Sequence, residues 1–375
     1  RIEKLREKYG AGCGSIRFTS LEEELSRAAF YIVTVLTPVD ERKNPDLTCL
    51  VEATRTVARY LKRGDYVVYE STVYPGCTEE VCVPLLEKGS GLKLGADFKV
   101  GYSPERINPN DSEHTFSNTA KIVSANDGQA LDEVARVYAE VVAADLCRAS
   151  GIRVAEAAKM TENVQRSVNI ALMNELQRLF SRMGIDMGEV IDMASSKWNF
   201  VKYRPGLGGG HCIPVDPLYL VSAASKLGVE MPVTSSGCAV NDGMAAYVVR
   251  SLLGAMGSDG RGARALLMGV TYKENIDDIR NSRIAEMVGL LEREGMSVDV
   301  TDPHADPDKV YAMYGIRPVP ALRPPYDLIV VAVAHDEYRG LDDAYFRSIS
   351  RGAALLGDIR GLYKGRIKSL GYWSL

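Results

Sequence analysis

The sequence has few of the residues and patterns that hold metals or dinucleotides. Its four histidines are dispersed, with none at the i, i+4 spacing of a helical metal site. Its seven cysteines form no CxxC pair, and no complete GxGxxG fingerprint occurs anywhere in the chain. We therefore expect no metal, no zinc ribbon and no disulfide framework. Free thiols in a large chain fit a reducing, cytoplasmic location.

An excess of basic charge and long apolar runs are also missing. The chain carries 45 basic and 49 acidic residues, a net charge of -4, so we expect no nucleic-acid partner. Its longest apolar stretches, such as Phe30 to Leu36, are far shorter than the ~20 residues of a membrane span, so we expect no membrane partner. Hydrophobic residues at 46% and charged residues at 25% are typical of soluble globular proteins. With 375 residues, two or three folded units are expected.

Residues 1–152 have the pattern of an α/β domain. Apolar, β-branched runs alternate with helical segments and are apolar on both faces, which indicates a parallel sheet covered on each side. The sequence starts at Arg1 without an initiator methionine, and Gly10 to Gly14 follows a charged helical turn rather than a strand. If this domain binds a dinucleotide, we expect its first strand-turn-helix upstream of Arg1. The predicted strands are Tyr31–Leu36, Tyr66–Tyr69, Phe98–Tyr102, Lys121–Ser124 and Ala144–Cys147.

A helical domain is predicted over residues 153–242 and a second α/β domain over residues 243–375. The first begins with a long helix from Ile152 to Met183 that contains no glycine or proline. The fold class is thus α/β, with two Rossmann-like, doubly wound domains joined by a long central helix. In the last domain Asp302 follows a predicted strand, where such domains often present a carboxylate to a ribose. The further predicted elements are helices Met187–Ala194, Val215–Leu227 and Ser282–Glu294 and strands Ala265–Val270, Ser297–Thr301, Asp327–Ala334 and Ala353–Leu356.

The densest chemical signal is the segment Arg204-Pro-Gly-Leu-Gly-Gly-Gly-His-Cys-Ile-Pro-Val-Asp216. Four glycines in five positions leave backbone N–H groups open to a phosphate or an oxyanion. Cys212 directly after them is placed as a nucleophile, and Asp216 follows on the next helix. The alternative is a flexible loop with an inert cysteine.

Two further clusters carry polar side chains. Lys159 and Asn163 are at i, i+4 on the long helix, so an ammonium and an amide share one face and could polarise a carbonyl. The alternative is a solvated helix face. Thr72 and Glu105 follow predicted parallel strands, at the edge where ligands gather. Their segments, Glu70-Ser-Thr-Val-Tyr-Pro-Gly76 and Ser103-Pro-Glu-Arg106, fit turn chemistry equally well.

These segments, together with Ala155-Glu-Ala-Ala-Lys-Met-Thr-Glu-Asn163 and Gly269-Val-Thr-Tyr-Lys-Glu-Asn-Ile-Asp-Asp-Ile-Arg-Asn-Ser282, resemble the UDP-glucose/GDP-mannose dehydrogenase family. Five ordered motifs span nearly the whole chain. Within the family, Tyr74 to Pro84 and Lys197-Trp-Asn-Phe200 are most similar to the UDP-N-acetylhexosamine 6-dehydrogenases of capsule, Vi-type and O-antigen synthesis. The resemblance implies an NAD-dependent, four-electron oxidation of a sugar C6 alcohol to a carboxylate.

The resemblance also implies a role for each site residue. Cys212 would hold the C6 aldehyde as a thiohemiacetal that becomes a thioester, and Lys159 and Asn163 would stabilise the oxyanion. Asp216 and Thr72 would organise water or proton transfer, and Glu105 would assist thioester hydrolysis. Contacts with NAD are implied for Thr37, Pro38, Ser71, Thr72, Glu105 and Arg280. Contacts with the UDP-sugar are implied for Tyr102, Arg106, Lys159, Asn163, Phe200, Lys202, Tyr203, Gly208, Gly209, Tyr272 and Lys273.

Other functions stay open at this point. The substrate is expected to be UDP-N-acetylglucosamine or its galactose epimer, with UDP-N-acetylmannosamine and UDP-glucose as alternatives. A catalytically silent nucleotide-sugar-binding paralogue would explain the missing glycine fingerprint, and an ordinary aldehyde dehydrogenase would explain the cysteine alone. The apolar surface of the long helix predicts a homodimer built along it.

Overall fold

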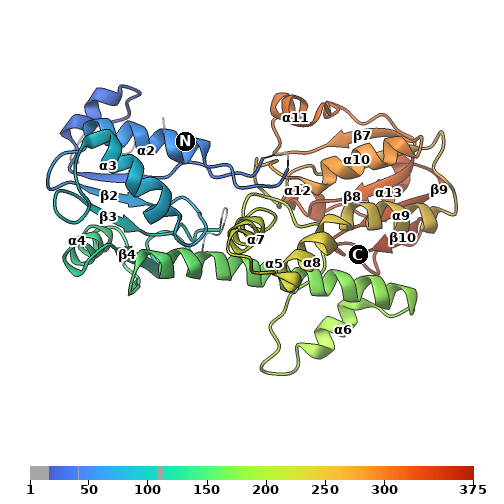
Figure 1. The fold of residues 1–375 in the computed structure, drawn as a ribbon. Helices are drawn as coiled ribbons and strands as arrows, with labels where there is room; N and C mark the ends of the chain where they lie inside the picture. Colours follow the sequence, from blue (N-terminus) through green and yellow to red (C-terminus); the bar gives the residue numbers. More distant parts are fainter. Residues whose placement is uncertain (1–16, 41, 109–110, 112) are drawn as a thin grey trace. The chain divides into compact units, whose positions relative to one another are not determined.

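The computed structural model describes residues 17–40, 42–108, 111 and 113–375, which form two compact units (Figure 1). Each unit contains one five-stranded sheet. The predicted turn at Gly10 to Gly14 lies outside the described residues. Unit 1 consists of the described residues of Arg1–Thr37, Asp46–Arg106 and Phe116–Ala157, and unit 2 of those of Pro38–Pro45, Ile107–Thr115 and Ala158–Leu375.

The sheet of unit 1 has the strand order β1-β2-β3-β4-β5. The first three strands are parallel as predicted, but β4 runs antiparallel to β3, so the expectation of an all-parallel sheet is wrong there. The described residues between β3 and β4 form no crossover helix, which a parallel connection normally requires. The strands are β1 Phe30–Val33, β2 Tyr66–Tyr69, β3 Lys99–Tyr102, β4 Lys121–Ala125 and β5 Leu146–Arg148.

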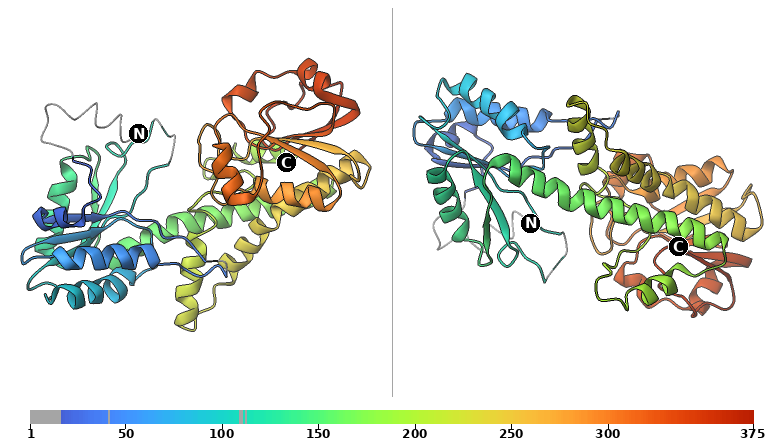
Figure 2. Two further views of the ribbon diagram at one scale, coloured as in Figure 1. Left: turned by 90° about the horizontal axis from the view of Figure 1, so that it is seen from above. Right: turned by 60° about the horizontal axis from the view of Figure 1, so that its bottom comes forward.

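Helices cover both faces of this sheet. Figure 2 shows α2 and α3 on one face and α4 on the other. Helix α2 is amphipathic and buries Leu50 and Val57, and the approach of α3 is so close that a Cβ on Gly89 would lie 2.6 Å from that of Ala58. Strand β3 is also tightly packed, because a Cβ on Gly101 would lie 2.8 Å from the carbonyl oxygen of Ser124. The helical elements are η1 Glu22–Arg27, α2 Thr48–Tyr60, the π-turn η2 Thr78–Cys82, α3 Val83–Ser90 and α4 Gly128–Ala139.

The long helix α5 spans Ile152–Arg182, as the sequence predicts. It ends where Gly184 adopts a positive φ of 71°, a conformation that glycine takes at little cost. The short helices α6 and α7 also match their predictions, whereas α8 and α9 were not predicted. Pro232 opens α8, and the chain restarts as α9 directly after Gly243. The bounds are α6 Met187–Ala194, α7 Asp216–Lys226, α8 Pro232–Asp242 and α9 Met244–Met256.

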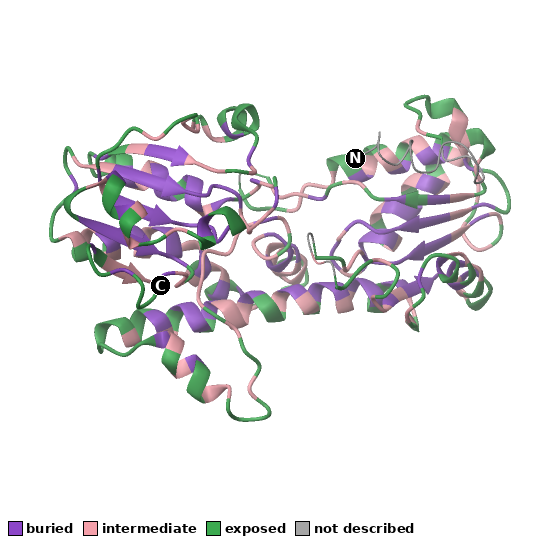
Figure 3. Cartoon of the chain, turned by 180° about the vertical axis from the view of Figure 1, so that it is seen from behind, coloured by how far each residue is buried: buried purple, intermediate pink, exposed green. Residues whose placement is uncertain are grey.

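The sheet of unit 2 is entirely parallel, with the order β10-β9-β8-β6-β7. This doubly wound order confirms the predicted fold class and places the topological switch point between β6 and β8. Alternate side chains bury on opposite faces: Leu267 packs towards α9 and α10, and Leu266 towards α13, so the strands are buried on both sides (Figure 3). The elements are β6 Arg264–Met268, α10 Arg283–Arg293, β7 Ser297–Thr301, α11 Pro307–Tyr314, β8 Tyr326–Val331, α12 Asp336–Arg339, α13 Asp343–Ile349, β9 Ser350–Asp358 and β10 Gly371–Ser374.

The packing of β3 generates a stability prediction. Gly101→Ala should lower the free energy of unfolding by about 1–3 kcal/mol, since the new methyl group meets backbone that cannot move aside cheaply. Gly128→Ala, at the first residue of α4 with no neighbour within 4 Å, is the matched control. It should leave stability unchanged or raise it by up to about 1 kcal/mol. Chemical denaturation measures both, and equal effects would contradict the packing argument.

Candidate active site

The carboxyl ends of β1 and β2 carry three of the predicted cofactor-binding residues. The Thr37 hydroxyl donates to the carbonyl oxygen of Thr72 at 2.7 Å, and the Ser71 hydroxyl donates to that of Val35 at 2.7 Å. These two bonds tie together the segments that follow the strands. Each hydroxyl keeps acceptor lone pairs, so both can still accept a hydrogen bond at this edge of the sheet. Pro38, the next predicted residue, belongs to unit 2, where its carbonyl oxygen accepts from Tyr219.

The segment after β3 holds Glu105 and Arg106 at the surface of unit 1. Both side chains are half-buried, and the Arg106 guanidinium donates to the carbonyl oxygen of Ala120 at 2.7 Å. Tyr102 is fully buried, so its side chain offers no surface to a ligand. A buried Lys121, which the sequence analysis missed, donates to the Pro104 carbonyl at 3.2 Å and pairs with Glu70 at 3.4 Å. These contacts fix the segment that presents Glu105.

A second residue that was missed, Glu156, shapes the turn after Thr72. Its carboxylate is completely buried and accepts from the amides of Gly76 at 2.6 Å and Thr78 at 2.9 Å. Burial raises the pKa of Glu156 above its usual value, and the two amide hydrogen bonds oppose that shift. The position of Glu156 within the Ala155–Asn163 motif, three residues before Lys159, was the available signal.

In unit 2 the structure brings Lys159, Asn163 and Asp216 together. All three are buried, with 6%, 3% and 1% of their surface exposed. The Asn163 amide donates to an Asp216 carboxylate oxygen at 2.5 Å. Burial raises the pKa of Asp216 to about 6, against the hydrogen bond from Asn163 and the charge of Lys159. A carboxyl group with this pKa can both accept and release a proton near neutral pH.

The Cys212 thiol lies beside this group and is accessible to solvent. Partial desolvation by the surrounding protein raises the pKa of the thiol, and the charge of Asp216 raises it further. The positive charges of Lys159, Arg166 and Arg280 act in the opposite direction. The backbone continues from Cys212 into α7, where the amide of Asp216 donates to the Cys212 carbonyl at 2.9 Å. The thiol is therefore reachable, free and surrounded by groups that control its ionisation.

The glycine loop Pro205–Gly210 is held at both ends by asparagines. The side chain of Asn174, from α5, accepts from the Gly206 amide at 2.8 Å, and that of Asn281 donates to the Gly210 carbonyl at 2.9 Å. Between them the backbone lies against Tyr272. A Cβ would be 2.9 Å from Tyr272 at Gly209 and 2.7 Å at Gly210, whose φ is +83°. Only glycine fits at these two positions. The loop is therefore packed against Tyr272 in a defined conformation and is not a flexible connector.

Other predicted substrate residues take part in local contacts. Lys202 pairs with Asp192 of α6 at 2.9 Å, and the Tyr203 hydroxyl donates to Gln165 at 3.4 Å. The Lys273 ammonium donates to Asn108 at 3.3 Å. Phe200 is half-buried, and its amide closes a turn back to Lys197.

Arg280 forms a two-point ion pair with Asp278, with bonds of 3.0 and 2.6 Å. This ion pair holds the guanidinium near the glycine loop, where its positive charge lowers the pKa of the Cys212 thiol.

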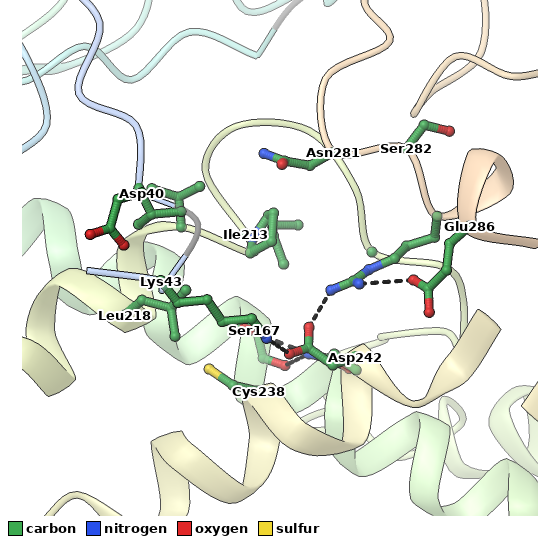
Figure 4. Close-up of a pocket in the computed structure, with 16 residues that line it drawn as sticks. Asp40, Lys43, Ser167, Ile213, Leu218, Cys238, Asp242, Asn281, Ser282 and Glu286 are labelled. Atoms are coloured by element: carbon green, nitrogen blue, oxygen red, sulfur yellow. Dashed lines mark hydrogen bonds and ion pairs between the residues drawn. The ribbon is translucent and has the colours of Figure 1, made fainter. Parts of the chain in front are cut away.

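A cavity of about 400 Å³ also opens in unit 2 (Figure 4). Of the predicted site residues, Gly208 alone is among those lining it. Asp242 joins two of its walls, because its carboxylate pairs with Lys43 at 2.5 Å and with Arg283. These ion pairs anchor the segment Pro38–Pro45 to α8 and α10.

The chain is also similar to known proteins. Three models of the UDP-glucose/GDP-mannose dehydrogenase family match: the NAD binding domain over residues 3–142, the central domain over 153–243 and the UDP binding domain over 266–365. The chain belongs to the UDP-glucose/GDP-mannose dehydrogenase family. It is thus an NAD-dependent oxidoreductase by family, and the last domain, which lacks a glycine fingerprint, is the one that binds UDP.

Individual relatives of this dehydrogenase chain cover most of its length. The UDP-N-acetyl-D-glucosamine 6-dehydrogenase of Pseudomonas aeruginosa is 46% identical over 92% of this chain and 83% of its own. That of Salmonella typhi is 45% identical over 96% of this chain and 84% of its own. A solved UDP-D-ManNAc dehydrogenase from Pyrococcus horikoshii superimposes with a TM-score of 0.85 at 28% identity, covering 95% of this chain and 83% of that one. Among the described residues, no helix is both long and apolar enough to cross a bilayer.

The raised pKa of Asp216 predicts a pH dependence of stability. In the folded protein the Asp216 carboxyl group has a pKa of about 6, whereas its ordinary pKa is 3.8. The folded state therefore binds this proton more tightly than the unfolded state, and the free energy of unfolding decreases as the pH rises from about 4 to 6. Asp216→Asn should remove this loss. Relative to the wild type, the variant should gain up to about 3 kcal/mol in free energy of unfolding between pH 4 and pH 7. Denaturation at both pH values measures this, and parallel pH profiles would disprove it.

The Asp216 carboxylate should also lower the reactivity of the Cys212 thiol. Since the charge of Asp216 raises the pKa of Cys212, the Asp216→Asn variant should be alkylated by iodoacetamide at Cys212 several-fold faster at pH 8. Mass spectrometry of the labelled peptide gives the rate, with the exposed Cys147 as internal reference. An unchanged ratio of the two rates would show that Asp216 does not act on the thiol.

Proposed function

We propose that the protein oxidises the C6 alcohol of a UDP-N-acetylhexosamine to the carboxylate in an NAD-dependent, four-electron reaction. The observation that carries this proposal is the accessible Cys212 thiol beside the buried Lys159, Asn163 and Asp216. A nucleophile next to an ammonium, an amide and a titratable carboxyl group is the set required to hold and release an acyl group. The two relatives named UDP-N-acetyl-D-glucosamine 6-dehydrogenase support the choice of substrate.

NAD fits the edge formed by Thr37, Ser71 and Thr72, whose hydroxyls and carbonyls are already ordered by hydrogen bonds to one another's segments. When bound, it accepts a hydride at each of the two oxidation stages. We propose that Pro38, Glu105 and Arg280 complete its contacts. Uncharged donors and acceptors at the ends of parallel strands are what a nicotinamide nucleotide meets in doubly wound domains.

The protein's own groups hold the carbonyl stage of the substrate. The Cys212 thiolate forms a bond to C6 of the aldehyde, and the carbonyl oxygen takes the negative charge. Lys159 and Asn163 stabilise that oxyanion from the rigid face of α5. Covalent attachment keeps the aldehyde from leaving between the two oxidations.

Water releases the acyl group after the second oxidation. The water oxygen bonds to C6, the C–S bond breaks and Cys212 is regenerated as a thiolate. Asp216 accepts the proton of the water, for which a pKa of about 6 is well suited. We assign Glu105 to assist this hydrolysis and Thr72 to orient the water.

The UDP-sugar would contact the glycine loop and the segment after β6. Gly208 and Gly209 offer backbone close to the ligand, and Tyr272 and Lys273 stand at the switch point of the second sheet, where doubly wound domains bind ligands. The other proposed contacts are Tyr102 through its backbone, Arg106, Phe200, Lys202 and Tyr203.

We propose the functional domains 1–152, 153–242 and 243–375, and a cytoplasmic homodimer. Leu172 and Leu179 are exposed apolar side chains seven residues apart on α5, a spacing that places them on one helical face, and the exposed Met183 directly follows the helix. Such a stripe suits pairing with a second copy of the helix. The six described cysteines are free thiols, which suits a reducing compartment.

A catalytically silent UDP-sugar-binding protein is the second candidate. The joint presence of Cys212, Lys159, Asn163 and Asp216 favours catalysis over this alternative.

The experiment offers UDP-N-acetylglucosamine, UDP-N-acetylgalactosamine, UDP-N-acetylmannosamine and UDP-glucose separately, and follows NADH by absorbance. We expect two NADH per sugar, with preference for a UDP-N-acetylhexosamine. Cys212→Ser should abolish uronate formation, by at least 10³-fold, and leave the affinity for UDP within about three-fold. Ser235→Ala, on α8 and outside the proposed site, is the control. Binding of UDP-sugars without any NADH from the wild type would favour the silent protein.

A further inference from the structure

The carboxylate of Asp302 is a buried connection point in unit 2. The sequence suggested a ribose ligand at this position, but the side chain has no exposed surface. Its two oxygens are occupied by hydrogen bonds from its own loop and from the segment that follows β6. They accept from the amides of Val270 at 2.6 Å, Thr271 at 3.1 Å, His304 at 2.8 Å and Ala305 at 2.9 Å, and contact Nε2 of His335 at 3.2 Å.

His335 extends this connection to a third segment. Its ring has no exposed surface, and Nδ1 accepts from the Asn275 amide at 3.0 Å. The proton on the ring is therefore assigned to Nε2, which faces Asp302 and the Thr271 hydroxyl, both at 3.2 Å. His304 and Glu337 lie close enough to complete a metal site with this ring. Both nitrogens of His335 are already used, however, so the ring has no lone pair for a metal.

Asp302, His335 and Thr271 form what we call the switch-point hub. They follow β7, β8 and β6 respectively, so the hub joins the carboxyl ends of the three strands around the switch point. The hub holds the segment Thr271–Asn275 at both ends. At the start, the amides of Val270 and Thr271 donate to the Asp302 carboxylate, and at the end, the amide of Asn275 donates to His335.

The segment held by the hub carries Tyr272 and Lys273. The Tyr272 amide donates to the Asp278 carbonyl at 3.1 Å, which folds the segment towards the catalytic loop. The side chain of Tyr272 fills the space that a Cβ would need at Gly209 and Gly210. The hub is thus linked to the Cys212 loop through one packed side chain.

We propose that Asp302 and His335 are positioning residues, which fix Tyr272 and Lys273 for the UDP-sugar and, through Tyr272, the glycine loop that presents Cys212. Neither residue touches the substrate. The proposal rests on the proposed function for its ligand, but the arrangement of the loops can be tested without activity.

The charge of Asp302 is part of this arrangement. Burial would raise the pKa of the carboxyl group, but the hydrogen bonds from His335 and from the amides of Val270 and His304 outweigh it, so the pKa lies well below its usual value. An asparagine at this position presents an NH₂ group to donors that need an acceptor. Asp302→Asn should therefore release part of the held segment.

Asp299 provides a matched control, because it lies on β7 three residues before Asp302. It is also buried, at 3% exposure, and its carboxylate accepts from Tyr326 at 2.8 Å and pairs with Arg264 and Arg323. None of these partners is in the segment Thr271–Asn275. Asp299→Asn thus breaks a comparable buried network in the same domain without touching the hub.

The binding test is UDP titration by calorimetry on the full-length chain carrying each variant, with thermal unfolding measured in parallel. We expect Asp302→Asn to weaken UDP binding at least ten-fold and Asp299→Asn less than two-fold, at similar losses of thermal stability. His335→Gln, which keeps a donor towards Asp302, should bind UDP more tightly than His335→Ala. Equal losses of affinity at positions 299 and 302 would overturn the proposal.

Amide hydrogen exchange separates this proposal from the proposed function. In Asp302→Asn we expect at least ten-fold faster exchange in peptides covering residues 269–276 and 205–212, and unchanged exchange there in Asp299→Asn. Exchange that stays slow over 205–212 would show that the hub does not set the catalytic loop. If wild-type protein fails to bind UDP, the proposed function fails, while the exchange result still decides whether the hub orders the two loops.

Discussion

The close contact between the backbone of Gly209–Gly210 and the side chain of Tyr272 is the constraint on which the site depends. Neither position has room for a Cβ, and Gly210 takes a positive φ. The glycine loop is therefore held in one conformation, by a hydrogen bond to Asn174 at its start and one from Asn281 at its end. The role that we propose for Cys212 as a nucleophile needs this kind of support, because small displacements of a reacting atom cost orders of magnitude in rate.

The chemistry of the site is obtained at some cost to stability. Asp216 is almost fully buried and has a pKa near 6, so keeping it ionised at neutral pH opposes folding. Asn163 and Lys159 recover part of that free energy through a hydrogen bond and a charge. Buried polar groups of this kind are typical of sites where function, and not packing, selects the residue. Glu156, in contrast, is a buried carboxylate whose hydrogen bonds serve the fold, since it accepts from the two backbone amides of the turn after Thr72.

The two sheets differ in how well the sequence predicted them. In unit 2 the runs predicted as strands are β6 to β9, and the helices between them fit their parallel order. Strand β10, which follows β9 with no described helix between them, was not predicted. In unit 1 the same kind of run at Lys121–Ala125 pairs antiparallel with β3, because an apolar run has no direction. Helices α8 and α9 were not predicted, because the sequence analysis placed no helix between Leu227 and the first strand of the last domain.

By itself the sequence determined most of the strands, the long helix α5, the glycine loop with Cys212 and the family, because local periodicity and close motif spacing are properties of the chain alone. Asn163 and Asp216 were named separately, but their 2.5 Å hydrogen bond depends on packing α5 against the start of α7. Only the tertiary structure decided that Asp302 connects three loops and does not face a ribose. A carboxylate after a strand looks the same in both cases, and its partners outside its own loop, Val270, Thr271 and His335, lie more than thirty residues away, after other strands.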